Sequence, residues 1–325
     1  MFGCHRWLAA AAAAVLFTGS AALHAQGYPA KSIRIIVAFP PGGTSDVVAR
    51  VLAQKLNETF GQPVVVENRP GAGGSLGAEL VAKAPADGYT LLFSSPAELA
   101  INVSLYTKLP YDPIRDFTPV TLATSAPLIL VAHPSLPVKS VRDLIALAKA
   151  RPRELNFGSG GSGSSPHMAL ELMREMAKVE FNHIPYKGTT PALADLLGGH
   201  LQLLFAGLTA ALPQVRADKL RALAVTTAKR SSLMPALPTV AESGLGGYVI
   251  DNWQGAVLPA NAPREIVARL NSEMVKILSL PEMKQRLSEQ GAEPVGTTPE
   301  RFAEYIKSEI DKYAQIIRKS GAKVD

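Results

Sequence analysis

The hydrophobic residues of this chain fall into two alternating patterns, short apolar runs and helical repeats, and glycine marks the change from one to the other. Residues 33–39 form an apolar, β-branched run that predicts a buried strand, and the run stops at a Pro-Pro-Gly-Gly turn, residues 40–43. Residues 44–46, Thr-Ser-Asp, offer side-chain oxygens that favour a helix start, and apolar residues then recur at helical spacing over 47–56. The pattern predicts a strand, a glycine turn and a helix N-terminus in succession.

A second unit with the same order lies further along the chain. A short run at residues 155–157 is followed by a glycine- and serine-rich turn at residues 158–165, and residues 166–168 open a helix. Glycines lack a Cβ and let a ligand approach the backbone closely, and the free N–H groups of a helix start attract an anion. We therefore predict that the two turns face each other across a cleft and hold one small carboxylate.

The alternation continues through the chain and determines the predicted fold class. It is typical of α/β proteins with a parallel sheet, in which ligands bind beyond the carboxyl ends of the strands. Two loop-rich crossings, near residues 120 and 226, predict a discontinuous first domain of residues 26–120 plus 227–325, a second domain of residues 121–226, and a cleft between them. Further strands are expected at residues 63–68, 89–93, 127–132, 181–186, 201–205, 223–226 and 253–258, and late helices at 263–278, 281–290 and 299–319.

Residues 1–25 are expected to form a signal peptide that is removed from the mature protein. Arg6 precedes an alanine-rich apolar stretch, residues 7–23, and residues 23–25, Leu-His-Ala, offer a cleavage site. A membrane anchor is the alternative, but the stretch is short and weakly hydrophobic for a stable span. Cys4 is the only cysteine and would be lost with the signal peptide, so disulfides and cysteine-ligated metals are not expected. We expect the chain to be secreted, and the family resemblance described below implies the periplasm of a Gram-negative bacterium.

Composition disfavours several classes of function. Apolar residues make up 47% of the chain and charged residues 18%, which is typical of a globular protein rather than a disordered one. The net charge is +6, but the lysines and arginines are scattered among acidic residues and form no dense basic block, so nucleic-acid binding is not favoured. A basic balance favours anionic ligands weakly, through long-range attraction.

Serine hydrolysis is one alternative function. Residues 73–77 match the hydrolase pattern G-x-S-x-G, with Ser75 as the nucleophile. The hydrolase elbow needs a strand that runs directly into the serine, whereas residues 69–72 intervene here. We therefore expect a binding protein without catalytic residues, and a serine esterase is the minor alternative.

Neither a nucleotide cofactor nor a metal site is predicted. The glycine turns lack the Gly-Lys-Ser/Thr of a phosphate loop and the spacing of a dinucleotide-binding fingerprint. His133, His167, His183 and His200 are not paired at metal-ligand spacing. His167 lies in the first turn of a predicted helix, where it either contacts the ligand or packs against the turn. Asp46 has the same two interpretations, as a ligand contact or as a helix cap.

A set of motifs along the chain resembles one known family, the Bug family, whose members are TctC-like extracytoplasmic solute-binding receptors of tripartite tricarboxylate transporters. The likeness covers essentially the whole mature chain, and the order and spacing of the motifs make it specific. The motifs are Tyr-Pro at residues 28–29, Phe-Pro-Pro-Gly-Gly-Thr-Ser-Asp at 39–46, Val-Glu-Asn-Arg-Pro-Gly-Ala-Gly-Gly at 66–74, Ala-Asp-Gly-Tyr-Thr-Leu at 86–91, the glycine turn from 158 to His167, Pro-Tyr-Lys-Gly at 185–188 and Trp-Gln-Gly at 253–255.

The resemblance implies a periplasmic, two-domain Venus-flytrap fold of type II topology with the ligand cleft between the domains. In that family two strand-to-helix loops hold a ligand carboxylate through backbone N–H groups, hydroxyls and bridging waters. The implied partners are a small organic, amino or aromatic acid and a two-component membrane permease, and we expect a monomer without cofactors. The implied ligand-binding residues are Phe39, Pro40, Gly42, Gly43, Thr44, Asp46, Ser94, Ser95, Gly158, Ser159, Gly160, Gly161, Ser162, Gly163, Ser164, His167 and Ala206.

The chain departs from the family pattern at positions predicted to line the distal half of the cleft. Ala206 stands where family members often have an acidic residue, and Glu98 and Leu99 stand where small or hydroxyl residues are common. Recognition of a particular ligand is therefore not carried over, and an apolar distal pocket favours a less polar acid. A ligand sensor for a membrane signalling partner is a further alternative, which the sequence does not separate from a transport receptor.

Overall fold

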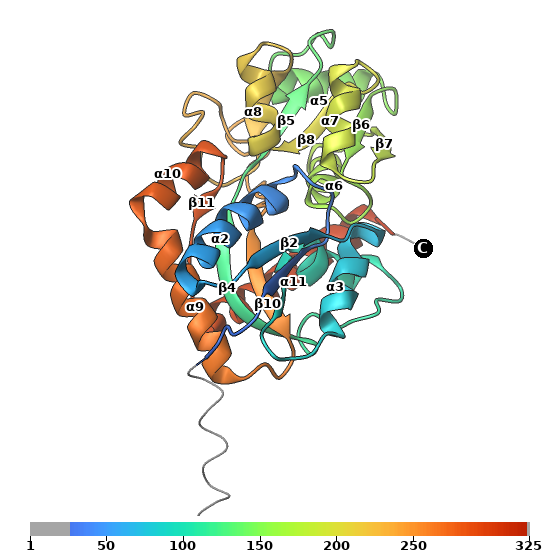
Figure 1. The fold of residues 1–325 in the computed structure, drawn as a ribbon. Helices are drawn as coiled ribbons and strands as arrows, with labels where there is room; N and C mark the ends of the chain where they lie inside the picture. The colour runs from blue at the N-terminus through green and yellow to red at the C-terminus, as the bar shows by residue number, and fades with distance from the viewer. Residues whose placement is uncertain (1–26, 324–325) are drawn as a thin grey trace, which may run out of the picture.

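A computed structural model describes residues 27–323, which form two α/β lobes, one above the other in Figure 1, joined by segments that cross between them. The predicted signal peptide lies outside the described residues. Each lobe contains one β-sheet with helices on both faces, so the two-lobed α/β architecture predicted from the sequence is confirmed. Between residues 27 and 323, no helix is both long enough and apolar enough to cross a membrane.

The larger lobe is built on a six-stranded sheet with the strand order β11-β4-β10-β3-β1-β2. Strands β1, β2 and β3 run parallel, whereas β10 runs antiparallel to both of its neighbours. The strands are β1 Ile33–Val37, β2 Val64–Asn68, β3 Thr90–Ser94, β4 Phe117–Ser125, β10 Gln254–Pro259 and β11 Glu293–Pro294.

Burial on both faces of this sheet follows from the side-chain alternation of its central strand. In β1, Ile33, Ile35 and Val37 pack in one cluster, and Ile36 packs in another on the opposite face, since successive strand side chains point in opposite directions. The first cluster includes residues of α2 (Thr44–Phe60), α9 (Arg264–Ser279) and α10 (Pro281–Glu289). The second includes residues of α3 (Ser75–Ala82), the short π-helix η2 (Ala97–Ile101) and α11 (Pro299–Ser320). Two short helices complete the lobe, η1 (Ala72–Gly74) and α4 (Asn102–Leu105).

The smaller lobe has a five-stranded sheet with the order β7-β6-β8-β5-β9. Helices α5 (Val141–Ala150) and α6 (Ser165–Ala177) pack on one face, and α7 (Thr189–Leu197) and α8 (Leu208–Arg216) pack on the other. Helix α11 of the larger lobe also contacts α6, so it spans both lobes. The strands are β5 Leu128–Ala132, β6 Asn156–Ser159, β7 Asn182–Pro185, β8 Leu203–Gly207 and β9 Arg221–Val225.

Both sheets are mixed, so the expectation of a parallel sheet was wrong for strands β10 and β11 of the larger lobe and for β5 of the smaller lobe. Strand β10 opposes β3 and β4, and β5 opposes β8 and β9. Strands β10 and β5 are each the first sheet strand that the chain forms after crossing to the other lobe, and the two-residue β11 pairs antiparallel with β4 at the sheet edge. The parallel strands end at the cleft, and a strand that enters its lobe from the cleft has to run the opposite way.

The two crossing segments lie side by side between the lobes. Pro127 and Asp251 form an antiparallel bridge, and the Ser125 hydroxyl donates a 2.8 Å hydrogen bond to the Asp251 carboxylate. Strand β4 remains in the larger sheet as far as Ser125, a few residues beyond the predicted crossing near residue 120. The predicted domain boundaries themselves stay a prediction.

Candidate ligand-binding site

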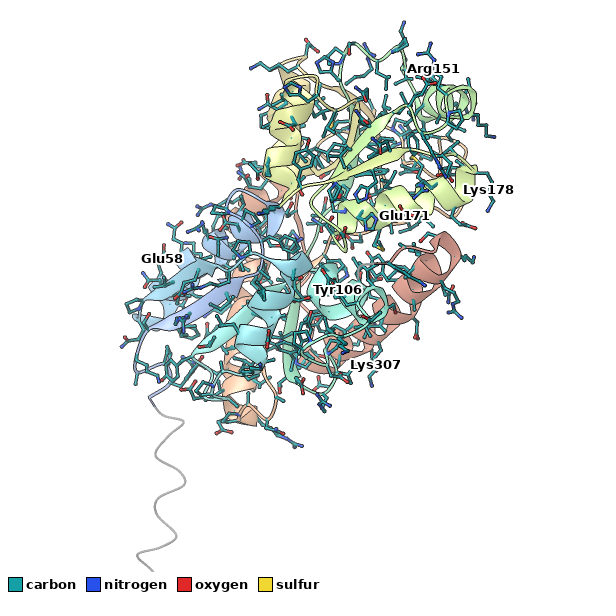
Figure 2. The ribbon with its side chains drawn as sticks, turned by 90° about the vertical axis from the view of Figure 1, so that its right-hand side faces the viewer. Glu58, Tyr106, Arg151, Glu171, Lys178 and Lys307 are labelled. Atoms are coloured by element: carbon teal, nitrogen blue, oxygen red, sulfur yellow. The ribbon has the colours of Figure 1, made fainter. Side chains whose placement is uncertain are left out.

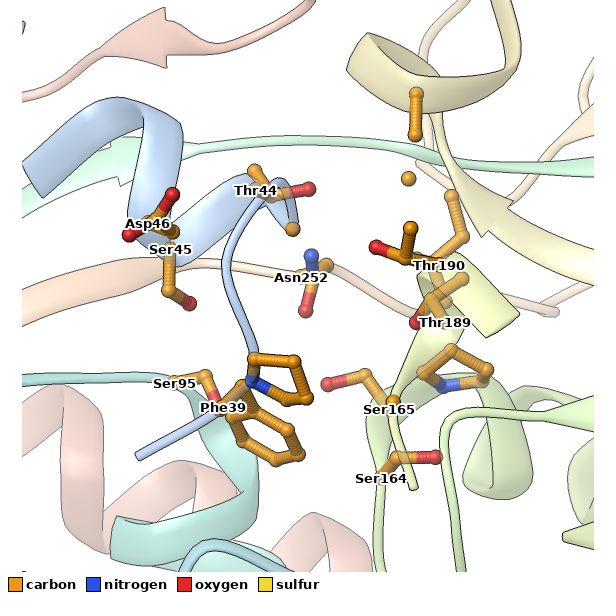
Figure 3. A pocket seen from close by; sticks show the side chains of 17 residues that line it. Phe39, Thr44, Ser45, Asp46, Ser95, Ser164, Ser165, Thr189, Thr190 and Asn252 are labelled. Carbon is orange, nitrogen blue, oxygen red and sulfur yellow. The ribbon is translucent and has the colours of Figure 1, made fainter. Parts of the chain in front are cut away.

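A cavity of about 60 Å³ lies where the two lobes meet, and its walls come from both (Figure 3). A volume of this size holds a few waters or one carboxylate-sized group. Its lining residues are Phe39, Pro40, Gly43, Thr44, Ser45, Asp46, Ser95, Leu128, Ser164, Ser165, Pro166, Gly188, Thr189, Thr190, Gly207, Ala210 and Asn252. We call this space the inner cavity.

Four helices begin at the wall of the inner cavity. Strands β1, β6, β7 and β8 each end at the cleft, and the chain turns directly into α2, α6, α7 and α8. The first turn of a helix has N–H groups without intrahelical partners, and its dipole favours a negative charge. In α2, α7 and α8 no side chain caps these groups, whereas in α6 the Ser164 hydroxyl accepts a hydrogen bond from the His167 N–H. The arrangement therefore presents backbone donors from both lobes to one space.

Several side chains of the cavity wall also have free hydrogen-bonding capacity. The side chains of Thr44, Ser45, Ser165, Thr189 and Asn252 line the cavity and make no hydrogen bond to any other part of residues 27–323. Figure 3 shows Thr44, Ser165, Thr189 and Asn252 around the same space. A few convergent polar groups without protein partners are typical of a ligand site, so these groups are suited to a polar ligand with several acceptor atoms.

Among the described residues that line the inner cavity there is no basic side chain, and the single acidic one is already paired. The Asp46 carboxylate accepts hydrogen bonds from the Gly42 N–H at 3.0 Å, from Arg50 Nε at 3.0 Å and from Asn68 Nδ2 at 2.9 Å. Burial by itself raises the pKa of Asp46, but these hydrogen bonds outweigh it, and the net effect lowers the pKa. Asp46 thus stabilises the turn between β1 and α2, and an anionic ligand would be held by helix dipoles and neutral donors.

A second, wider space adjoins the inner cavity and opens to solvent. This outer compartment has a volume of about 560 Å³ and shares Phe39, Pro40 and Gly188 with the inner cavity. Its walls are mainly apolar and aromatic side chains and glycine backbone, and Lys187 is the one charged residue among the described residues that line it. Figure 2 shows Tyr106 at the side of the larger lobe that faces the smaller one. The remaining lining residues are Pro70, Gly71, Ala72, Gly73, Gly74, Gly160, Gly161, Ser162, Pro185 and Tyr186.

The structure brings together ten of the predicted site residues at these two spaces. Phe39, Pro40, Gly43, Thr44, Asp46, Ser95 and Ser164 line the inner cavity, and Gly160, Gly161 and Ser162 line the outer compartment. Seven others line neither space: Gly42, Ser94, Gly158, Ser159, Gly163, His167 and Ala206.

His167 and Ser159 lie behind the second glycine turn and support it. His167 Nδ1 accepts a 3.2 Å hydrogen bond from the Gly163 N–H, and its ring stacks on His183 with 4.4 Å between centroids. His183 Nε2 lies 2.7 Å from the Ser159 hydroxyl, which accepts a hydrogen bond from the Gly161 N–H. Burial lowers the pKa of His167 to about 3, so the ring is neutral and can accept. Of the two interpretations of His167, a ligand contact or packing against the turn, the second describes its position in the structure.

Of the other five residues, Gly163 donates to His167, and Gly42 donates to Asp46 and faces the other lobe, where a Cβ would lie 3.7 Å from Thr190 Oγ1. The remaining three are turned away from the cleft. Ser94 is fully buried and donates to the Gly255 carbonyl at 2.9 Å. A Cβ at Gly158 would lie 2.5 Å from a Leu201 methyl, which shows how closely the helix layer covers β6. Ala206 is buried among residues of α7 and α8 and lines neither space. Helices cover both faces of β8, and of its residues Gly207, at the end of the strand, lines the inner cavity.

Sequence analysis missed several residues of the inner cavity. Thr189 and Thr190 follow the Pro-Tyr-Lys-Gly turn after β7. This is a third place where a strand is followed by glycine and then by hydroxyl residues, so the pattern could have indicated that both residues belong to the site. Asn252 lies on a crossing segment, where no local pattern points to a site. The missed lining residues are Ser45, Leu128, Ser165, Pro166, Gly188, Thr189, Thr190, Gly207, Ala210 and Asn252.

Ser75 does not have the partners of a hydrolytic nucleophile. It is buried at the start of α3, and within residues 27–323 its hydroxyl accepts a 3.1 Å hydrogen bond from Asn102 Nδ2 and has no histidine partner. A serine nucleophile needs a general base within hydrogen-bond reach. In the same part of the chain, no three His, Cys, Asp or Glu residues are grouped to hold a metal ion.

Comparison with known proteins identifies the family of this two-lobed chain. Residues 48–322 match the family model of the tripartite tricarboxylate transporter family receptor, TctC. The chain belongs to this family. It is 42% identical over 306 residues to Protein BugT of Bordetella pertussis, with 94% of each chain covered. It is 37% identical over 316 residues to a UPF0065 protein from a tcbD-tcbE intergenic region of Pseudomonas sp., covering 97% of this chain and 94% of that one.

Solved structures of this receptor family have the same fold. An R. palustris protein with adipate superposes with a TM-score of 0.88 at 40% identity, covering 90% of this chain and 98% of that one. MatC from Rhodopseudomonas palustris with bound malate gives 0.85 at 32% identity, covering 89% and 100%. The periplasmic binding protein BugD gives 0.86 at 32% identity, covering 91% and 99%. The chain is therefore a periplasmic solute-binding protein of the TctC receptor family, and the resemblance found in the sequence is confirmed.

Proposed function

We propose that this TctC-family receptor captures a small carboxylic acid between its lobes and delivers it to a two-component tripartite tricarboxylate-type permease. The observation that carries the proposal is the inner cavity, where four helix N-termini and unpaired side-chain donors surround a space with no basic side chain among its described lining residues. A carboxylate fits this arrangement because it carries one negative charge and several acceptor positions.

The two connected spaces support a division of the ligand into two parts. The carboxylate would lie in the inner cavity, and the rest of the ligand would extend past Phe39 and Pro40 into the outer compartment. The outer walls offer Tyr106, Tyr186 and prolines, so they favour a methylene chain or a ring over a strongly charged group. The relatives with adipate and malate support a small dicarboxylic acid as the first class to test.

The remaining parts of the proposal follow from family membership and from the sequence. We propose that residues 1–25 direct export to the periplasm, that the receptor acts as a monomer, and that it acts by binding rather than by catalysis. Capture would proceed by closure of the lobes, because a ligand that bonds to both lobes stabilises the closed state by its differential affinity.

The test is a thermal-shift and calorimetric screen of the mature receptor against mono-, di-, tri- and aromatic carboxylates, with adipate and malate included. Removing a hydroxyl from the cavity by Ser165→Ala or Thr189→Val should weaken the best acid by about 10-fold or more, since a hydrogen bond to a charged group contributes about 1.5–3 kcal/mol. Thr107→Val removes an exposed hydroxyl outside both spaces and should leave the affinity unchanged. Failure of every acid to bind, or equal losses in all three variants, would overturn the proposal.

A further inference from the structure

A buried carboxyl group lies directly behind the wall of the inner cavity. Glu98, on η2, is 1% exposed, and its Oε2 accepts hydrogen bonds from the Ser95 N–H at 2.9 Å and from the Ser95 hydroxyl at 2.6 Å. Ser95 itself lines the cavity, beside Phe39 in Figure 3. The Ser95 hydroxyl therefore connects Glu98 to whatever occupies the cavity.

Glu98 has no cation to balance its charge. Among residues 27–323 the donors to its carboxylate are the Ser95 hydroxyl and N–H, together with the N–H of Glu98 itself, and no lysine, arginine or histidine forms an ion pair with it. The segment around it is tightly packed, because a Cβ added at Gly74 would lie 2.9 Å from Glu98 Cγ. Burial raises the pKa of Glu98 to about 7, and the Ser95 hydrogen bonds lower it only in part. Both protonation states are therefore accessible near neutral pH.

The titratable groups around Glu98 leave this conclusion intact. Tyr111 follows α4 in the chain, and its hydroxyl donates to the Glu98 backbone carbonyl at 2.7 Å. Burial raises the pKa of Tyr111 and keeps it protonated. The parts of β3, η1 and α4 that pack against η2 contain no ionisable side chain. Across the cavity, the charge of Asp46 is paired with Arg50. Helix α11, which packs against η2, has Glu309 paired with Lys312 and Trp253, together with Tyr305 and Tyr313.

The direction of the Ser95 hydroxyl depends on the state of Glu98. When Glu98 is ionised, Ser95 donates its one hydroxyl hydrogen to the carboxylate, and only oxygen lone pairs face the cavity. These lone pairs and the buried negative charge behind them repel an incoming carboxylate. When Glu98 is protonated, its O–H donates to Ser95 Oγ, and the Ser95 hydrogen is free to donate to the ligand.

We propose that Glu98 is a positioning residue that couples carboxylate capture to the uptake of one proton from solvent, acting through Ser95. The inference rests on the proposed function, since it needs an acid in the inner cavity. The only bond that forms is the O–H bond of Glu98, and the ligand remains an anion. Affinity for an anionic acid then falls as the pH rises above the range in which free Glu98 loses its proton.

The test is calorimetric titration of the mature receptor with adipate at about pH 6 and about pH 8.5, in pairs of buffers that differ in ionisation enthalpy. The wild type should take up close to one proton per adipate at the higher pH and little at the lower, and its affinity should fall about tenfold or more between them. Glu98→Gln keeps acceptor and donor atoms in place and should bind with the same affinity at both pH values. Glu300→Gln, at an exposed position outside both spaces, should behave like the wild type.

A measurement without ligand completes the test. In protein labelled with ¹³C at glutamate carboxyls, the resonance that Glu98→Gln removes should titrate near pH 7 in the free protein and at higher pH with adipate. Titration of that resonance in the ordinary glutamate range would overturn the inference. Adipate binding without proton uptake would overturn the inference and leave the proposed function standing, whereas failure of every acid in the panel to bind would overturn both.

Discussion

Gly188 lies where the two lobes touch. Replacing it by alanine should have two effects, one on the free energy of folding and one on the free energy of closing the cleft. Its φ of +123° falls in a region that side-chain-bearing residues rarely adopt. A Cβ there would lie 2.9 Å from Pro40 Cγ and 3.0 Å from Pro40 Cδ, across the cleft in the other lobe. The backbone strain exists whenever the smaller lobe is folded, whereas the clash exists only when the lobes are closed.

The two costs are similar in magnitude, and a matched control separates them. A residue held in a glycine-only region costs about 1–3 kcal/mol, and an overpacked contact against a rigid ring costs about 1–3 kcal/mol more. Gly244 has a φ of +119°, and a Cβ there would have only an Arg142 Nε atom nearby, at 3.8 Å. Gly244→Ala therefore carries similar backbone strain without a contact between the lobes, and it is the matched control.

Urea denaturation and calorimetric titration with the best acid distinguish the two effects. Both variants should lose about 1–3 kcal/mol of unfolding free energy, and only Gly188→Ala should also lose affinity, by roughly 5- to 150-fold. Equal affinities in Gly188→Ala and Gly244→Ala would refute the reasoning, because they would mean that the ligand-bound state does not bring Gly188 against Pro40.

Three further predictions concern buried polar groups. The folded protein holds the proton of Glu98 to about pH 7, whereas an unfolded glutamate releases it near pH 4.3, so the free energy of unfolding should fall as the pH rises between these values. In urea denaturation at pH 8, Glu98→Gln should be more stable than the wild type by ~3 kcal/mol. Equal pH profiles of the two proteins would contradict this. Burial lowers the pKa of His167 to about 3 and that of His183 to about 4, so the free energy of unfolding should fall as the pH drops from about 6.5 to 4. In His183→Gln the urea midpoint should change less with pH over this range. An unchanged pH dependence of the midpoint would argue against this reasoning. Trp253→Phe removes the 2.9 Å bond to the buried Glu309 carboxylate and should cost about 1.5–3 kcal/mol of unfolding free energy, and a loss below roughly 0.5 kcal/mol would count against that bond.

The sequence determined the local units of this protein. The apolar run before Pro40, the glycine turn and the helical repeat after Asp46 are local patterns, and β1 and α2 form where those patterns change. The same holds for β6 and α6 around the second glycine turn. The order and spacing of such units were enough to predict the two-lobed fold and to recognise the family. This is because strand and helix periodicity and turn chemistry depend on neighbouring residues only.

Only the tertiary structure decided which of these residues meet. The run Leu-Leu-Phe-Ala-Gly at β8 is apolar throughout, so its sequence does not show that helices cover both faces and that Ala206 lines neither the inner cavity nor the outer compartment. Asn252 reaches the cavity, and β10 runs antiparallel, because the chain crosses twice between lobes and enters each sheet from the cleft. The link from Glu98 through Ser95 to the cavity likewise depends on burial by elements distant in sequence, since burial of a carboxyl is a property of the packed fold.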